Sequence, residues 1–180
     1  MKAAIVCEGS NDKAFLTAFI EHLKLKIEPA FYILRGKSFL FDATNAQYQE
    51  LKRAMAAEPH RLLFVVDADD AQNDARYGGF ENTQHALQQL LADLQLDADC
   101  SSYILCDPLT QTGYLESLIL STISASQRSC IESFLACSEF PSKENHKAIL
   151  NSIYKTAYPN APFDFSHPHF DELKSKLLAL

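Results

Sequence analysis

The chain has 180 residues, a length that suits one domain or one domain with a small appendage, and its 47% hydrophobic and 22% charged residues are ordinary for a folded protein. Sixteen Lys and Arg residues against 23 Asp and Glu residues give a net charge of −7, which argues against broad nonspecific binding of nucleic acid. No Lys or Arg occurs between Tyr77 and Gln127, so a phosphate-bearing partner has to approach elsewhere or through bound cations. No apolar run reaches the length of a membrane span or of a secretory signal, and we therefore expect a cytoplasmic protein.

The five cysteines indicate neither a disulfide framework nor a zinc site, because their number is odd and no C-x-x-C spacing occurs. Cys7 and Cys106 lie in apolar runs, so we expect them to pack as small hydrophobic residues. A catalytic thiol is the less favoured interpretation, since no motif supports it.

Four short apolar runs alternate with longer amphipathic segments in the first 107 residues, and each run is typical of a buried strand. The predicted strands are Lys2–Cys7, Ala30–Leu34, Arg61–Val66 and Ser102–Cys106. The predicted helices are 11–24 with Ser10 as N-cap, a second running to Ala57 with Thr44 or Asn45 as N-cap, and Glu81–Leu96. This alternation predicts an α/β fold, in which a four-stranded parallel sheet is flanked by helices on both faces.

After Asp107 the strand pattern ends and the remaining segments have helical periodicity. The predicted helices are Gly113–Ile123, Gln127–Ala136, Lys143–Tyr158 and Asp171–Leu180, with the Pro-rich 159–168 as a surface connection. We expect residues 1–110 to form the α/β domain and residues 111–180 to form a helical extension packed on the same domain.

Acidic residues directly follow the first and third predicted strands. Glu8 and Gly9 close the first, whereas Asp67, Asp69 and Asp70 close the third. Ligand sites in parallel sheets lie beyond the carboxyl ends of the strands, so these carboxylates are expected to converge. Crowded carboxylates raise one another's pKa, and a hard divalent cation such as Mg²⁺ or Mn²⁺ relieves the repulsion. In the alternative interpretation, the acids cap the following helices or face water.

With Glu-Gly after the first strand and Asp-x-Asp after the third, the chain resembles the Toprim family over about residues 1–107. The segment EGSNDKAFLTAFIEHL is especially similar to small stand-alone Toprim proteins and to the Toprim module of OLD-type nucleases (overcoming lysogenization defect). The resemblance implies a Rossmann-like sheet, Glu8 as general acid, base or metal ligand, and Asp67 and Asp69 as Mg²⁺ ligands. No segment resembles the tyrosine-bearing cleavage domain of topoisomerases or the zinc-binding part of primases, so it implies the fold and metal site more directly than the reaction.

Glu116 lies in an otherwise apolar helical segment, where an acid is costly unless it is solvated, paired or bound to a cation. OLD-type modules are similar in having an acid in a helix after the last core strand, and this likeness implies a second metal ligand at Glu116. The alternative is a helix that turns Glu116 toward solvent.

Candidate substrate contacts surround the same sheet edge. Gly9 permits a tight strand-to-helix turn and close approach of a phosphate, and Arg35 and Lys37 follow the second strand, where they could hold a phosphate or form a solvated turn. Lys13 could neutralise Asp12 or face a phosphate, although helical spacing also suits a surface charge. Six aromatic residues are expected to be packing residues rather than base-stacking platforms, namely Phe39, Phe41, Tyr48, Phe163, Phe165 and Phe170.

The leading hypothesis is therefore a Mg²⁺-dependent enzyme acting on phosphodiester bonds, most simply a nuclease on DNA or RNA approached through the bound metal. The alternative is a non-catalytic metal-binding Toprim module that acts as the partner of a separate ATPase or of a defence or repair protein. A receiver domain or phosphatase ranks last, because those folds place an Asp after the first strand, where this chain has Glu8.

Overall fold

The structure is a computed structural model, and it describes residues 2–96, 100–138, 152 and 164–180. Its centre is a four-stranded sheet in which every pairing is parallel, with strand order β2-β1-β3-β4. The strands are β1 (Lys2–Cys7), β2 (Ala30–Ile33), β3 (His60–Asp67) and β4 (Cys100–Leu105). The predicted fold class is therefore confirmed, and each predicted strand lies within two residues of an observed one.

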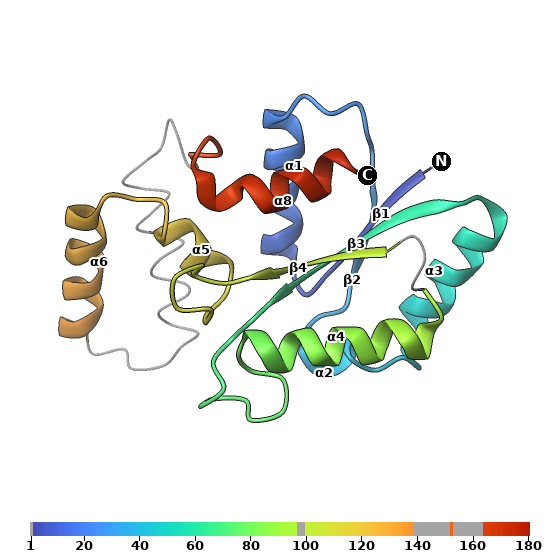
Figure 1. Cartoon of the computed structure of the whole chain (residues 1–180), viewed down its shortest axis with the longest axis horizontal. Coiled ribbons are helices and arrows are strands. Elements are labelled where there is room, and N and C mark those ends of the chain that lie inside the picture. The colour runs from blue at the N-terminus through green and yellow to red at the C-terminus, as the bar shows by residue number, and fades with distance from the viewer. Residues whose placement is uncertain (1, 97–99, 139–151, 153–163) are drawn as a thin grey trace.

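Helices cover both faces of the sheet (Figure 1). The helices of the first 107 residues are α1 (Ser10–His22), α2 (Lys37–Leu40), α3 (Ala46–Ala57) and α4 (Phe80–Leu94). Those that follow are α5 (Leu115–Leu120), α6 (Ala125–Cys137), the 3-10 turn η1 (Pro168–Phe170) and α8 (Asp171–Leu178). The predicted helix Lys143–Tyr158 and most of the segment 159–168 lie outside the described residues.

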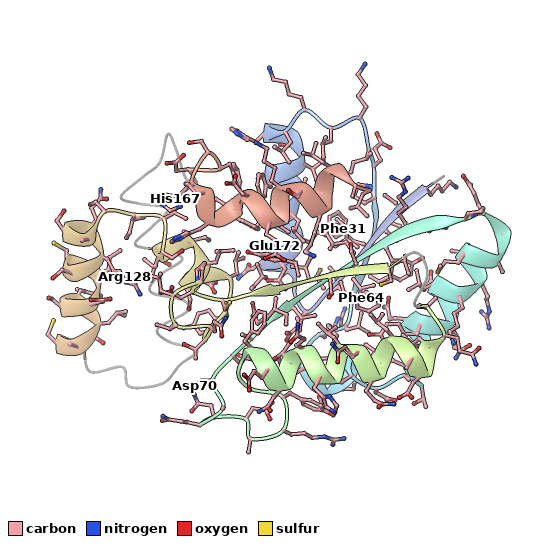
Figure 2. All side chains as sticks on the ribbon, viewed as in Figure 1. Phe31, Phe64, Asp70, Arg128, His167 and Glu172 are labelled. Atoms are coloured by element: carbon pink, nitrogen blue, oxygen red, sulfur yellow. The ribbon has the colours of Figure 1, made fainter. Side chains whose placement is uncertain are left out.

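The side chains of β1 and β3 alternate between two hydrophobic clusters, as the period of two in a strand requires. Val6 and Phe64 point to the face covered by α3 and α4, and Figure 2 shows Phe64 on that side of the sheet. Ile5 and Val65 point to the opposite face, which α1, α5 and α8 cover. The helices that follow Asp107 thus share a core with the sheet, since Leu118 and Leu173 are completely buried in that second cluster.

The N-cap residues of α1 and α3 were both predicted; the first prediction is wrong, and the structure decides between the two residues offered for the second. Gly9, not Ser10, is the N-cap of α1, and its N–H donates to Asp12 Oδ2 at 2.8 Å. Of the two predicted caps for α3, Asn45 is the one used, because its side chain accepts from the Gln47 N–H at 3.0 Å. Helix α2 was not predicted, since a four-residue helix is too short to show hydrophobic periodicity.

No helix among the described residues is long and apolar enough to cross a membrane.

Candidate functional site

The two central strands, β1 and β3, bring together the acidic residues that follow each of them. Glu8 follows the last residue of β1, and Asp67 is the last residue of β3. The parallel register pairs Cys7 with Val65, so Glu8 comes beside the end of β3. Glu8 Oε1 accepts a hydrogen bond from the backbone N–H of Asp67 at 3.1 Å. Residues separated by 59 positions in the chain therefore meet at one point on the carboxyl edge of the sheet.

The carboxyl group of Glu8 is held where a negative charge is unfavourable. Burial, followed by the nearby charges of Asp67 and Asp69, raises the pKa of Glu8 from 4.5 to about 8, and only the ammonium of Lys37 opposes this shift appreciably. The group therefore retains its proton at neutral pH in the absence of a further cation. A raised carboxyl pKa beside two other acids is the arrangement found in proton-transfer and metal sites.

Asp67 is fixed by the helix that follows the sheet. Its side chain is 6% exposed, and its Oδ1 accepts a hydrogen bond from the backbone N–H of Leu115 at 3.0 Å. The next residue, Glu116, is only 3% exposed, which excludes the interpretation in which α5 turns this acid toward solvent. The first turn of α5 thus orients Asp67 and brings a fourth acid to the same region.

Asp69 does not stand beside Asp67 in the way an extended segment would place it. Its φ is 61°, in the left-handed region that non-glycine residues rarely adopt. Two backbone hydrogen bonds hold this conformation, from Asp69 N–H to the Gly113 carbonyl at 2.5 Å and from Gly113 N–H to the Asp69 carbonyl at 2.9 Å. Asp69 therefore leaves the extended conformation of the strand, and its Oδ2 lies 3.4 Å from Lys37 Nζ.

Lys37 is a buried cation within the protein rather than an exposed one. Its residue is 8% exposed, and its ammonium donates to the carbonyls of Ala68 and Tyr77 at 2.8 and 2.9 Å and to Thr83 Oγ1 at 3.0 Å. Three acceptors match the three N–H donors of an ammonium, which leaves none for a substrate phosphate. The predicted substrate contact at Lys37 is therefore replaced by a structural one, which ties α2 to the loop after β3.

The other predicted contacts lie around the edge of the site. Arg35 is exposed, its backbone N–H donates to the Glu8 carbonyl at 2.8 Å, and its φ is 59°. Lys13 is exposed and its Nζ lies 5.3 Å from the centroid of the Phe31 ring. Of the cations predicted to contact substrate, Arg35 is thus the one whose backbone is hydrogen-bonded to the backbone of Glu8.

Two predicted residues have local roles. Gly9 has extended backbone angles, φ −141° and ψ 172°, so its turn does not require glycine, contrary to the sequence argument. Asp70 Oδ1 accepts from the Gln72 N–H at 2.9 Å and so stabilises the turn after Asp69. Figure 2 shows Asp70 in this loop, which extends away from the sheet beyond β3.

A cavity of about 230 Å³ lies at the meeting point and is lined by Glu8, Asp67, Gly36 and the first turn of α1. We call it the acidic cavity. Among the described residues no group of three or more His, Cys, Asp or Glu side chains is already arranged to hold a metal ion. The oxygen-only donors nevertheless suit Mg²⁺, which keeps several water ligands and needs only one or two carboxylates. Glu8 and Asp67 are the residues that would hold such an ion.

The two cysteines nearest this edge do not act as nucleophiles at neutral pH. Burial raises the pKa of Cys7 to about 12 and that of Cys106 to about 11, so both thiols stay protonated. Both are packed in the core, as predicted from their apolar surroundings.

The roles of α2, Thr83 and Phe39 are not visible in the sequence. Thr83 is completely buried and its hydroxyl lies 2.6 Å from the Tyr77 carbonyl. Phe39 is 56% exposed, so it is not the packing residue that was expected. No local pattern reveals either role, because both depend on which distant segments meet at the sheet edge.

No family model, no curated protein and no solved structure matches this chain, so comparison with known proteins identifies no relative.

Proposed function

We propose that this protein is a Mg²⁺- or Mn²⁺-dependent enzyme of the Toprim type that acts on phosphodiester bonds, and that its reaction is cleavage of DNA or RNA. The observation that carries the proposal is the contact between Glu8 and Asp67 across the two central strands, together with the effect of Asp67 and Asp69 on the pKa of Glu8. Acids packed this closely are unfavourable unless a cation or a proton compensates them.

Each residue has a separate task in this proposal. Glu8 and Asp67 bind the ion, Asp67 in an orientation set by the Leu115 N–H. A bound divalent ion supplies Lewis-acid polarisation of a phosphoryl oxygen and lowers the pKa of water. Arg35 binds a phosphate of the substrate beside Glu8, and Lys37 holds the loop that carries Asp69.

Glu8 also holds a proton in the metal-free state, because its pKa is about 8. A carboxyl group with this pKa transfers protons efficiently near neutral pH. Within the site, its Oε1 accepts a hydrogen bond from the Asp67 N–H at 3.1 Å, which orients the group in the lining of the acidic cavity.

The test begins with metal binding, measured as thermal stabilisation by Mn²⁺. Wild-type protein is expected to gain about 2 to 3 kcal/mol at a Mn²⁺ concentration 100 times its Kd. Asp67→Asn removes one ligand and abolishes most of this gain. Asp93→Asn is the matched control, since Asp93 is an exposed residue of α4 whose Oδ1 accepts a hydrogen bond from Gln89 in the same helix. Equal stabilisation of wild type and Asp67→Asn would place the ion elsewhere.

Activity is then measured on labelled single- and double-stranded DNA and RNA. We expect Asp67→Asn and Glu8→Gln to lower the cleavage rate by at least about 100-fold, in the range of a lost proton-transfer or metal contribution, while Asp93→Asn retains it. Cleavage that persists in Asp67→Asn would contradict the proposal. Metal binding without cleavage would favour the alternative of a non-catalytic module that serves a separate ATPase or repair protein.

A further inference from the structure

A second and larger hollow adjoins the acidic cavity. It has a volume of about 850 Å³ and shares Glu8, Gly9 and Ser10 with the acidic cavity as part of its lining. Its other walls come from the end of β2, from α2 and from the start of α3. Because they include aromatic side chains, we call it the aromatic cavity. An occupant of this cavity lies next to Glu8, which links it to the chemistry of the neighbouring site.

The lining combines three kinds of side chain. Phe31 and Phe39 provide aromatic rings. Gln47 contributes an amide group and Arg35 a cation, whereas the Asn45 amide already bonds the Phe39 carbonyl and the Gln47 N–H. Ring faces stack on bases, amides donate to and accept from base edges, and a guanidinium binds phosphate.

The backbone around Phe39 is held firmly although its ring is exposed. Asn45 Nδ2 donates to the Phe39 carbonyl at 3.2 Å, and the Tyr48 hydroxyl donates to the Leu40 carbonyl at 2.5 Å. The buried ammonium of Lys37 fixes the first residue of the same helix. Phe39 is thus a 56% exposed residue on a short helix whose first and last residues are held by hydrogen bonds, which fixes the backbone that carries its ring.

The negative net charge of the chain bears on whether a single strand or a duplex is bound. The chain carries a net charge of −7 and has no Lys or Arg between Tyr77 and Gln127, so it offers few cations to follow the two backbones of a duplex. Stacking on an aromatic side chain requires an exposed base face, and in a duplex that face is covered by the neighbouring base pairs. The cavity therefore suits an unpaired base better than a base pair.

We propose that the aromatic cavity binds one unpaired nucleobase of a single-stranded nucleic acid, stacked on Phe39, with the adjoining phosphate at Arg35 and Glu8 beside it. This proposal rests on the proposed function, whose substrate it narrows to single strands. In this proposal Phe39, which the sequence led us to expect as a packing residue, binds the substrate.

The test is fluorescence anisotropy of the full chain with labelled 12-mers in Ca²⁺, with the probe verified as intact on a gel. The probes are a single-stranded DNA, a single-stranded RNA, the matched blunt duplex, and an abasic strand that keeps the phosphates. Wild type is expected to bind the single strands at least tenfold more tightly than the duplex and the abasic strand. Comparing the DNA and RNA strands distinguishes the two sources of the base.

Phe39→Ala is expected to weaken single-strand binding by about 5- to 150-fold, which corresponds to the loss of one base–aromatic stack. Phe39→Tyr keeps the ring and restores affinity. The matched control is Phe134→Ala, because Phe134 is 49% exposed but belongs to α6 and not to the cavity. Since Phe39 is exposed, its removal should leave the fold intact, which circular dichroism verifies.

An affinity for single strands that stays within twofold in Phe39→Ala would overturn the inference, as would equal binding of the abasic strand. Binding that depends on Phe39 without any cleavage would leave the inference standing and remove only the nuclease proposal. Cleavage that depends on Asp67 while Phe39→Ala binds normally would do the reverse.

Discussion

Lys37 provides the sharpest test of the structure, because a buried lysine that bonds three segments should be costly to replace. Methionine has a similar length but lacks the charge and the donors. In Lys37→Met, each carbonyl keeps one donor, which is the Gly79 N–H at 2.9 Å for Ala68 and the Thr83 hydroxyl at 2.6 Å for Tyr77. Neither carbonyl is therefore left without a donor, so the cost of the substitution comes chiefly from the lost charge.

The substitution also removes the cation 3.4 Å from Asp69 Oδ2. Breaking a buried ion pair costs about 3 to 5 kcal/mol, but the Asp69 side chain is 20% exposed, so we take the lower end of that range. The expected loss in the free energy of unfolding is about 3 kcal/mol in total. For a chain of this size that corresponds to a fall in Tm of roughly 6 to 12 °C.

Urea unfolding followed by circular dichroism measures this loss. Lys2→Met is the matched control, since Lys2 forms an ion pair with Glu58 at 3.1 Å in which the side chains are 65% and 44% exposed. Such exposed pairs contribute no more than about 1 kcal/mol. Adding Asp69→Asn to Lys37→Met should recover the part of the loss that belongs to the uncompensated carboxylate. If Lys37→Met costs no more than Lys2→Met, the assignment of Lys37 as a structural cation is wrong.

Three further predictions concern the same edge of the sheet. Gly113→Ala should destabilise the protein by about 1 to 3 kcal/mol more than Gly36→Ala in urea unfolding: both glycines have positive φ, but a Cβ at Gly113 would lie 2.2 Å from Ser117 Oγ, whereas one at Gly36 meets nothing within 4 Å. Equal costs would show that Ser117 moves aside easily. In EDTA, Glu8→Gln should gain stability relative to wild type as the pH rises from 5 to 8.5, because a pKa raised from 4.5 to about 8 gives wild type stability that is complete at low pH and lost as the pH rises through 8. A Tm difference between these two proteins that is independent of pH would contradict the shift. The affinity for Mn²⁺, measured by calorimetry, should fall as the pH drops below 8, because Glu8 must lose its proton to bind the ion. The Asp93→Asn control should show the same pH dependence as wild type. An affinity that does not change with pH would exclude Glu8 as a ligand.

The sequence alone determined the sheet and the place of the acids. Buried parallel strands appear as continuous apolar runs, so Lys2–Cys7 was predicted with its observed bounds, and the other three strands within two residues. Once four such runs alternate with helices, the acids that follow the first and third strands must lie at the carboxyl edge of the sheet. The meeting of Glu8 with Asp67 follows from this connectivity and from the adjacency of the two strands.

Only the tertiary structure decided what the surrounding side chains do. The acceptors of Lys37 lie 31, 40 and 46 residues further along the chain, so no window of sequence shows that its ammonium is enclosed. Asp69 departs from the alternation of a strand because Gly113, 44 positions later in the numbering, bonds its backbone in a left-handed conformation. Phe39 is exposed because the hydrogen bonds of its neighbours place a four-residue helix at the rim of a cavity. Periodicity reports which face of an element is buried, whereas these roles depend on contacts between elements, and those exist only after the chain has folded.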